Sequence, residues 1–162
     1  MSDILSKIPL VYEPLRPNRF IVKIPSDLGI QSWWVTSSGM PSLNINSVEI
    51  PWMNTSTYIP GRFTWEKIDV VFKSLIGPSS AQAIMEWVRL CAESATGRMG
   101  YAAGYKRHMS IEMLDPTGVS VQKWVLENAF LTTISFGSNK YDDDSIAEIT
   151  CSVQYDRAIL VF

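Results

Sequence analysis

The chain has very few of the residues that carry most enzyme chemistry. It contains one histidine, His108, and two cysteines, Cys91 and Cys151, in 162 residues. A lone histidine leaves no partner for a Ser-His-Asp or Cys-His arrangement, and no CxxC motif or metal-ligand spacing connects the cysteines to it. No glycine-rich loop ends in GK[ST], and no dinucleotide fingerprint follows a strand-like segment. We therefore predict no catalytic, cofactor-binding or metal-binding residues, no cofactor, and a protein that is not an enzyme.

The chain also has few charged residues, and neither positive nor negative residues predominate. Charged residues make up 19% of the chain and the net charge is −2. Lysines and arginines are scattered, and the run 106–108 (Lys-Arg-His) is too short to form a basic stripe. The run 142–144 (Asp-Asp-Asp) lacks the glycine and the final glutamate of an EF-hand loop, so it predicts a solvated hairpin tip. This composition excludes a protein built to grip nucleic acid.

Long apolar runs are missing as well. No window approaches the roughly 20 apolar residues that a membrane span needs. The N-terminal segment MSDILSKIPLVYEPLRPNRF is interrupted by charges and prolines before the apolar core of a signal peptide forms. We expect no membrane insertion and no cleaved export signal. Cys91 and Cys151 lie in apolar contexts and are predicted to be buried thiols made in a reducing cytoplasm, although a disulfide within or between chains stays open.

Segments with alternating apolar and polar residues dominate what remains. Strands are predicted at 18–25, 31–36, 106–114, 119–136 and 145–156, with a bend or bulge at Asn128-Ala129 and a turn at 115–118 (Asp-Pro-Thr-Gly). In the last strand Ala147, Ile149, Cys151, Val153 and Tyr155 are expected to face inward. The fold class is therefore mainly β, an antiparallel β-sandwich or small barrel with one flanking α-helix. We expect a single domain, residues 1–162, in which 1–17 form an extended N-terminal arm.

One helix is predicted to follow Pro78. Ser79 and Gln82 suit a capping box at its start, and Gly97 is expected to end it. Ala81, Ile84, Val88, Cys91 and Ala95 recur at helical spacing, with Trp87 at the margin of that apolar face. Residues 98–105 are predicted to be a flexible loop. A single amphipathic helix in a β-rich chain indicates a helix packed against a sheet.

The rest of the chain is organised around residues 48–73, which read VEIPWMNTSTYIPGRFTWEKIDVVFK. Two apolar, β-rich runs in this stretch predict a hairpin, with its turn at Pro60-Gly61. The second run, 64–73, is expected to be a half-buried strand. If Gly61 needs a positive φ, a β-branched residue there would disturb the hairpin.

Both ends of the chain are too apolar to remain in water. The arm carries many aliphatic residues between its prolines, and the final segment 158–162 (AILVF) is apolar on both faces. Each segment either covers its own sheet or packs on a neighbouring subunit. Such segments and long strand edges are aggregation hazards in a monomer but adhesive surfaces in an assembly. The residues thus favour a self-assembling structural protein; a small-ligand-binding β-barrel or an enzyme of unfamiliar type is the alternative.

Several segments, in order along nearly the whole chain, resemble the tail tube proteins of contractile-tailed bacteriophages. They are RPNRF at 16–20, Met40-Pro41, IPWMN at 50–54, YIPG at 58–61, Thr64-Trp65, the tryptophan-bearing helix, LDPTG at 114–118, Trp124 and the strand 149–156. The resemblance implies a β-barrel or sandwich subunit with a flanking helix. It also implies that six copies form a ring, that the inner sheets join into one barrel, and that the rings stack into the inner tail tube.

The resemblance further implies the partners and the location. These are other copies of the chain, the tail sheath protein, the tape-measure protein, the baseplate tube-initiation proteins and the tail terminator. Genomic DNA would pass through the tube at ejection without specific binding. The protein would be assembled in the host cytoplasm and reside in the virion tail. A tube-initiator baseplate protein, or the tube subunit of a related contractile injection or secretion system, is the alternative within this structural class.

Two sets of residues are candidates for these roles. Inter-subunit contacts are expected from Trp52, Met53, Asn54, Tyr58, Ile59 and Phe162. The polar sides of the last alternating strand are candidates for the tube lumen: Glu148, Thr150, Ser152, Gln154 and Asp156.

Overall fold

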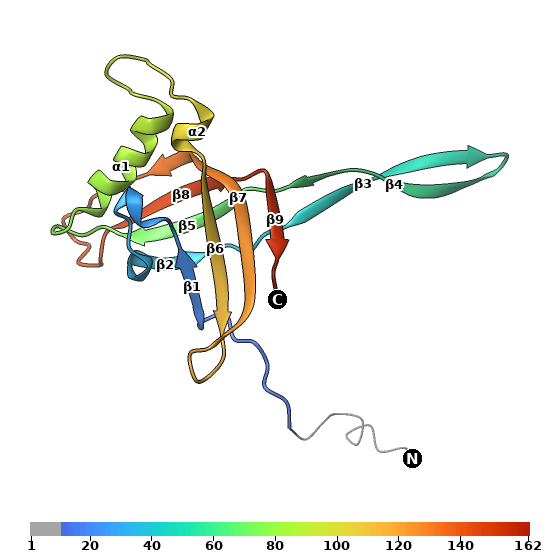
Figure 1. Ribbon diagram of the computed structural model, residues 1–162, viewed down its shortest axis with the longest axis horizontal. Coiled ribbons are helices and arrows are strands. Elements are labelled where there is room, and N and C mark those ends of the chain that lie inside the picture. The colour runs from blue at the N-terminus through green and yellow to red at the C-terminus, as the bar shows by residue number, and fades with distance from the viewer. Residues whose placement is uncertain (1–10) are drawn as a thin grey trace.

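A computed structural model describes residues 11–162, so the first part of the predicted N-terminal arm, residues 1–10, lies outside the described range. Residues 11–17 run as an exposed, extended segment away from the body. Figure 1 shows a body of strands with helices at one side, from which a long two-stranded hairpin projects. The mainly β, antiparallel architecture expected from the sequence is confirmed.

The body is one antiparallel system of strands with the order β1-β6-β7-β8-β5-β2, and β9 pairs with β7 as well. Its strands are β1 (Phe20–Lys23), β2 (Val35–Ser38), β5 (Ile68–Lys73), β6 (Arg107–Leu114), β7 (Ser120–Ser135), β8 (Glu148–Gln154) and β9 (Arg157–Leu160). The predicted turn between β6 and β7 forms as expected, with the Gly118 N–H donating to the Asp115 carbonyl oxygen at 3.1 Å. The Asp115 carboxylate also accepts the N–H groups of Thr117 and Val119.

The strand β7 is shared by two half-sheets. Its first half lies between β6 and β9, and its second half pairs with β8. Between the two halves Asn128 has a φ of 56°, a conformation that asparagine tolerates better than most residues. The Asn128 side chain donates to the Asp156 carboxylate at 2.8 Å. The bend predicted at Asn128-Ala129 is therefore confirmed, and it folds one half-sheet over the other.

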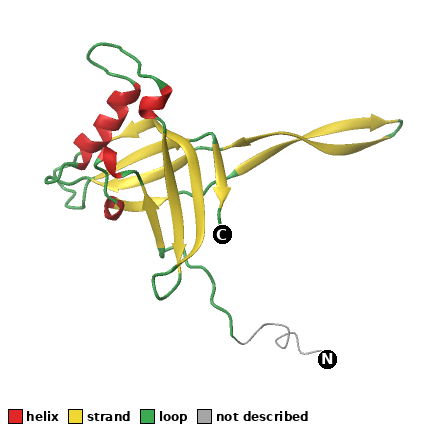
Figure 2. Ribbon diagram, in the orientation of Figure 1, coloured by secondary structure: helices red, strands yellow, loops and turns green. Residues whose placement is uncertain are grey.

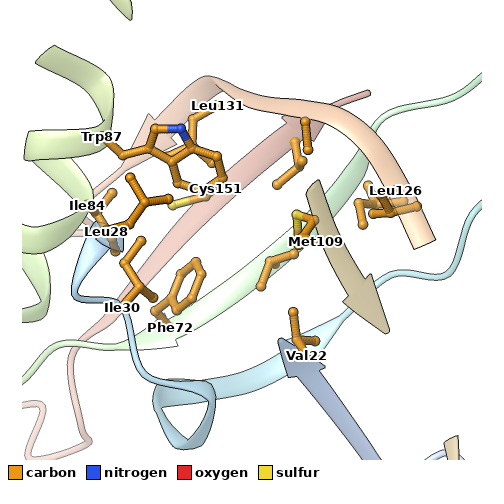
Figure 3. Close-up of a cluster of buried hydrophobic side chains, with 14 of the residues drawn as sticks. Val22, Leu28, Ile30, Phe72, Ile84, Trp87, Met109, Leu126, Leu131 and Cys151 are labelled. Carbon is orange, nitrogen blue, oxygen red and sulfur yellow. The ribbon is translucent and has the colours of Figure 1, made fainter. Parts of the chain in front are cut away.

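The core lies between these half-sheets, and the period of two in each strand explains which residues fill it. Ile149, Cys151 and Val153 of β8 are buried, as expected, and so is Tyr155. Ala147, which was expected to face inward with them, is exposed and precedes β8, so that prediction was wrong. In Figure 3, Leu131 and Cys151 from the strands meet Trp87 and Ile84 from the helix.

The main helix, α1 (Ser80–Cys91), begins where the sequence predicts, with the Ser79 side chain accepting the Gln82 N–H. It ends earlier than expected, because Ala92 is extended and pairs with Met99 in a short antiparallel bridge. Gly97, with a φ of 71°, turns the loop that makes this bridge and does not end the helix. Trp87 is fully buried and not marginal, since its indole N–H donates to the Tyr105 carbonyl oxygen at 2.9 Å.

Short helical segments replace two expected features. A single helical turn, α2 (Ala102–Tyr105), lies within the segment predicted as a loop and packs beside α1. Two 3-10 turns, η2 (Ser26–Leu28) and η3 (Ser32–Trp34), precede β2, and η3 occupies the first part of the strand that was expected from residue 31. The η3 turn aims Trp34 into the core and leaves Trp33 largely exposed. Figure 2 shows the helices gathered at one side of the strands, which leaves the hairpin side uncovered.

Candidate assembly interface

The hairpin consists of β3 (Leu43–Trp52) and β4 (Thr55–Trp65), joined by Met53 and Asn54. Met53 takes the positive φ, 50°, that this tight connection requires. The prediction of a turn at Pro60-Gly61 was wrong, because both residues lie inside β4. Proline is tolerated there because the register shifts between Ile45 and Ser47. Gly61 has no positive φ; an added Cβ would instead lie 2.9 Å from Val48 Cγ2.

The predicted strand 64–73 is divided between the hairpin and the body. β4 ends at Trp65 and β5 begins at Ile68. The Trp65 ring packs against Trp124 of β7 and Tyr155, with ring centroids 6.5 and 6.2 Å apart. The Glu66 N–H donates to the Ser42 carbonyl oxygen at 3.0 Å, which closes the base of the hairpin. These contacts fix the direction in which the hairpin leaves the body.

The residues expected to contact other subunits lie in two places. Trp52, Met53, Asn54, Tyr58 and Ile59 are all exposed on the outer half of the hairpin, with Trp52 69% and Met53 87% accessible. Phe162 lies instead at the C-terminal end of the body, where the Lys123 N–H donates to its carbonyl oxygen. The structure therefore separates Phe162 from the other contact candidates.

Four of the five lumen candidates share one surface. Glu148, Thr150, Ser152 and Gln154 alternate with the buried residues of β8 and thus lie on the side of β8 away from the core. The Ser152 hydroxyl donates to Asp69 of β5 at 2.6 Å, and Lys73 stands opposite Glu148. Asp156 follows β8 and is bound by Lys106 and Asn128, so it does not belong to this surface. Hydrogen bonds and Lys106 lower the pKa of Asp156, with the Asn128 amide the main cause.

This polar surface belongs to a half-sheet with two open edges. Its strands are β2, β5, β8 and the second half of β7, in that order. Among the described strands β2 pairs with β5 alone, and residues 130–135 of β7 pair with β8 alone. Each edge therefore presents backbone groups that can pair with another chain. The sequence alternation revealed the polar face, but strand order, and hence the edges, depends on long-range pairing.

The other half-sheet has a different outer face. Glu112 is buried there between Lys23 Nζ, at 2.9 Å, and Lys123 Nζ, at 3.7 Å. The hydrogen bond from Lys23 is the main cause that lowers the pKa of Glu112. Beside this charged cluster, Val121, Ile159 and Val161 are exposed, and we call this group the β9 face.

The residues that enzymes use remain dispersed. His108 is exposed on β6, and Asp142 to Asp144 lie in the expected loop. No group of histidine, cysteine and acidic side chains within residues 11–162 is arranged to hold a metal ion. Both cysteines are free; Cys151 is buried as predicted, which raises the pKa of its thiol to about 12, but Cys91 is only partly buried. None of the described helices is long and apolar enough to cross a membrane.

Comparison with known proteins identifies this architecture. No protein-family model matches the chain, and comparison with curated sequences finds no significant relative. The anti-feeding prophage cap, described as the tube terminating cap, matches with a TM-score of 0.76 and 19% identity over 99% of this chain and 98% of that one. The sheath-tube complex of an extracellular contractile injection system, PVC, matches with a TM-score of 0.73 and 19% identity over 98% of both chains. The chain has a contractile-system tube fold.

This tube fold extends to more distant proteins. Hcp1 from Flavobacterium johnsoniae matches with a TM-score of 0.50 and 8% identity, over 88% of this chain and 94% of that one. The expected likeness to tube proteins is thus confirmed at the level of fold. The neighbours with the higher scores come from tail-like injection machines.

Proposed function

We propose that this protein is a structural subunit that forms rings with copies of itself, and that the rings stack into the inner tube of a contractile, tail-like particle. The observation that carries the proposal is the half-sheet β2-β5-β8-β7. It combines a polar outer face with an open edge on each side, in a fold that matches tube components along almost its whole length. A ring of six copies, with these half-sheets joined edge to edge, is the arrangement we propose.

The two open edges determine how neighbouring copies would join. When β2 of one copy pairs with the second half of β7 in the next, the contact joins two different surfaces and repeats until a ring closes. Backbone pairing across every such junction removes both open edges, which in a monomer would be an aggregation hazard. The polar face of β8 would then line the lumen, with Glu148, Thr150, Ser152 and Gln154 facing it.

The proposed lumen surface would let DNA pass through the tube without binding it. Lys73 stands opposite Glu148, and Asp69 is bound by Ser152, so these charges are one lysine and two carboxylates and form no basic stripe. A polyanion such as genomic DNA would gain no counterion release from such a wall. We therefore propose DNA as the cargo in transit, with a sheath outside the tube and baseplate, tape-measure and terminator proteins at its ends or inside it.

The hairpin and the C-terminal end supply the remaining contacts. Trp52, Met53, Tyr58 and Ile59 extend beyond the body on a ribbon that the subunit itself does not cover. An isolated two-stranded hairpin is at best marginally stable in water. We propose that its outer half, with Asn54, contacts another copy, and that Phe162 contacts a copy at a separate place.

A second candidate is a tube end piece. Two structural matches favour an end piece: the anti-feeding prophage cap, with a TM-score of 0.76, and the baseplate of the same particle, with a TM-score of 0.65. They support an end piece as specifically as the match to the sheath-tube complex supports a tube subunit. An end piece contributes only a few copies per particle, whereas a tube subunit occurs in many copies. Quantitative mass spectrometry of purified particles therefore separates them, and abundance comparable to the sheath is the expected result.

Assembly itself is tested with purified protein. Negative-stain microscopy over a range of concentrations is expected to show rings or tubes; a monomer at every concentration would overturn the proposal. The edge contact is tested with Thr36→Cys and Thr133→Cys together, on exposed positions of β2 and β7. A short bis-thiol crosslinker is expected to join neighbouring copies around the ring, and either single variant serves as the control.

The lumen assignment has its own test. Tubes of the unchanged protein are expected to show no binding to short double-stranded DNA at low salt. Tubes carrying Thr150→Lys and Ser152→Lys are expected to retain DNA, with a strong salt dependence. The control is Asn44→Lys on the hairpin, which leaves the proposed lumen unchanged. Thr36→Lys is less suitable because it lies on a neighbouring strand edge.

A further inference from the structure

The apolar side chains of the hairpin change faces halfway along it. Side chains of a strand alternate between its two faces. In β3 the apolar residues near the base are Leu43 and Ile45, at odd positions, whereas those near the tip are Val48, Ile50 and Trp52, at even positions. The two polar residues Asn46 and Ser47 separate the sets. The base and the tip of β3 therefore direct apolar groups to opposite faces of the ribbon.

β4 makes the same change by means of a β-bulge. Ser47 pairs with Pro60 and Ile45 with Phe63, so one residue of β3 stands opposite Gly61 and Arg62 of β4. Near the tip Ile59 pairs with Val48, and near the base Phe63 pairs with Ile45. The extra residue thus keeps Phe63 on the same face as Ile45, while Ile59 stays on the face of Val48. The bulge thus keeps apolar residues paired on both of its sides, whereas nearer the tip Ile50 and Trp52 pair with Thr57 and Thr55.

The ribbon itself turns over between its two halves. Figure 1 shows β3 and β4 crossing midway, with β4 above β3 toward the body and below it toward the tip. Strong right-handed twist is usual in two-stranded ribbons, and a bulge increases it locally. The ribbon turns over in the same region in which its apolar residues change faces. The apolar residues near the base and those near the tip therefore lie on the same side of the hairpin.

The opposite side is consistently more polar. It carries Asn44, Asn46, Arg62 and Thr64 near the base, and Ser47, Glu49, Ser56 and Tyr58 near the tip. Both charged residues of the hairpin, Glu49 and Arg62, are on this side. One side of the projecting ribbon is thus mainly apolar, with Thr55 and Thr57 as its polar members, and the other is mainly polar, with Pro51 and Pro60 as its apolar members.

We propose that the hairpin is a one-sided strap that lies along the surface of one other copy of this chain. Of the contact candidates, Trp52 and Ile59 lie on its apolar side, whereas Tyr58 lies on the polar side, which stays in solvent. This proposal rests on the proposed function and deepens it, because assembly alone does not say whether the hairpin is enclosed on both sides or covered on one. The bulge at Gly61 is the device that keeps the apolar side continuous through the twist.

A second copy is the occupant that the chain itself supports. The hairpin points away from its own body, so its apolar side is not covered within the subunit (Figure 1). The same chain carries a second exposed apolar group elsewhere, the β9 face of Val121, Ile159 and Val161, which lies next to Lys123. Two complementary, unpartnered surfaces on one chain form a heterologous contact that repeats from copy to copy.

Paired charge substitutions on the two sides test the proposal. Phe63→Glu and Ile50→Glu place a charge on the apolar side, near the base and near the tip. Asn44→Glu and Glu49→Arg are matched controls on the polar side at the same two levels. Both apolar-side variants are expected to raise the concentration needed for half-assembly at least tenfold, and both controls are expected to change it less than twofold.

Thiol protection in assembled tubes gives an independent measurement. In a Cys91→Ser background, single cysteines at Phe63 and Ile50 are expected to be protected from a maleimide, whereas cysteines at Asn44 and Glu49 are expected to stay reactive. Protection or charge sensitivity on both sides would overturn the one-sided strap, as would free reactivity at Phe63 or Ile50. If the unchanged protein forms no rings or tubes at all, the proposed function fails instead.

Discussion

The buried hydroxyl of Ser80 donates to the Lys73 carbonyl oxygen at 2.7 Å and accepts the Leu75 N–H at 2.8 Å. This pair joins the first residue of α1 to the last residue of β5. The hydroxyl is completely inaccessible, so water cannot replace either bond. The helix is therefore fixed to the half-sheet that we propose forms the tube wall.

Ser80→Ala is expected to lower the free energy of unfolding by about 1 to 3 kcal/mol, because it leaves buried backbone groups without partners. Urea denaturation at a concentration below assembly measures the effect. Ser79→Ala is the matched control. It removes only the exposed cap bond to Gln82, which is 3.4 Å long, and is expected to cost about 0.5 kcal/mol. Equal costs for the two variants would contradict the role of Ser80.

Gly100→Ala is expected to destabilise the loop that follows α1. A Cβ at Gly100 would lie 1.9 Å from the Leu90 carbonyl oxygen, and this backbone atom can move only with the end of the helix. A loss of about 1 to 3 kcal/mol is typical of such overpacking. Gly104→Ala meets no atom within 4 Å and is the control. Thermal unfolding of the two variants is the measurement, and an unchanged midpoint for Gly100→Ala would be the contrary result.

The Glu112 carboxylate is expected to make stability depend on acid pH. Lys23 lowers its pKa in the folded state, so its contribution is present above the ordinary glutamate pKa and is lost as the pH falls through the lowered value. Glu112→Gln cannot titrate. The stability advantage of the unchanged protein over Glu112→Gln is therefore expected to be full at pH 7, to decrease as the pH falls below the ordinary glutamate pKa, and to be lost below the lowered pKa. Denaturant titrations at several pH values test this, and a constant difference would contradict it.

Gly61→Val is expected to impair assembly more than folding. Its side chain would collide with Val48 Cγ2 and approach the Asn46 carbonyl oxygen, which lies 3.2 Å from the Cβ position. The hairpin is separate from the core, so the body should unfold within about 0.5 kcal/mol of the unchanged protein. Gly77→Val, at an open position, is the control. If Gly61→Val formed normal tubes, the bulge would not be part of the assembly contact.

The sequence predicted the features that depend on local pattern. The alternation in β8 revealed both its buried and its polar side chains, and Ser79 with Gln82 located the start of α1. The Asp115–Gly118 turn and the bend at Asn128 followed from residues with strong backbone preferences. Each of these signals acts over a few residues, so no knowledge of distant contacts was needed.

The errors occurred where a distant partner overrides a local preference. Pro60-Gly61 has the composition of a turn, yet pairing with β3 retains both residues in β4, with Pro60 opposite Ser47 and Gly61 in the bulge opposite Asn46. Gly97 suits a helix end, but the bridge between Ala92 and Met99 ends α1 first. Trp87 was expected at the margin of the helix face, and its bond to Tyr105, a distant residue, places it in the core. The open edges of β2 and β7 likewise follow only from strand order.

The path of β7 through both half-sheets has a mechanical meaning. A sandwich held only by side-chain packing can shear, because its two layers can slide past each other. In this subunit covalent backbone crosses from one layer to the other, and the bonds from Asn128 and Lys106 to Asp156 hold the crossing point. A force applied to the proposed lumen surface would therefore reach the outer layer along the chain itself. Such a wall would move as one rigid piece when a tube is driven forward.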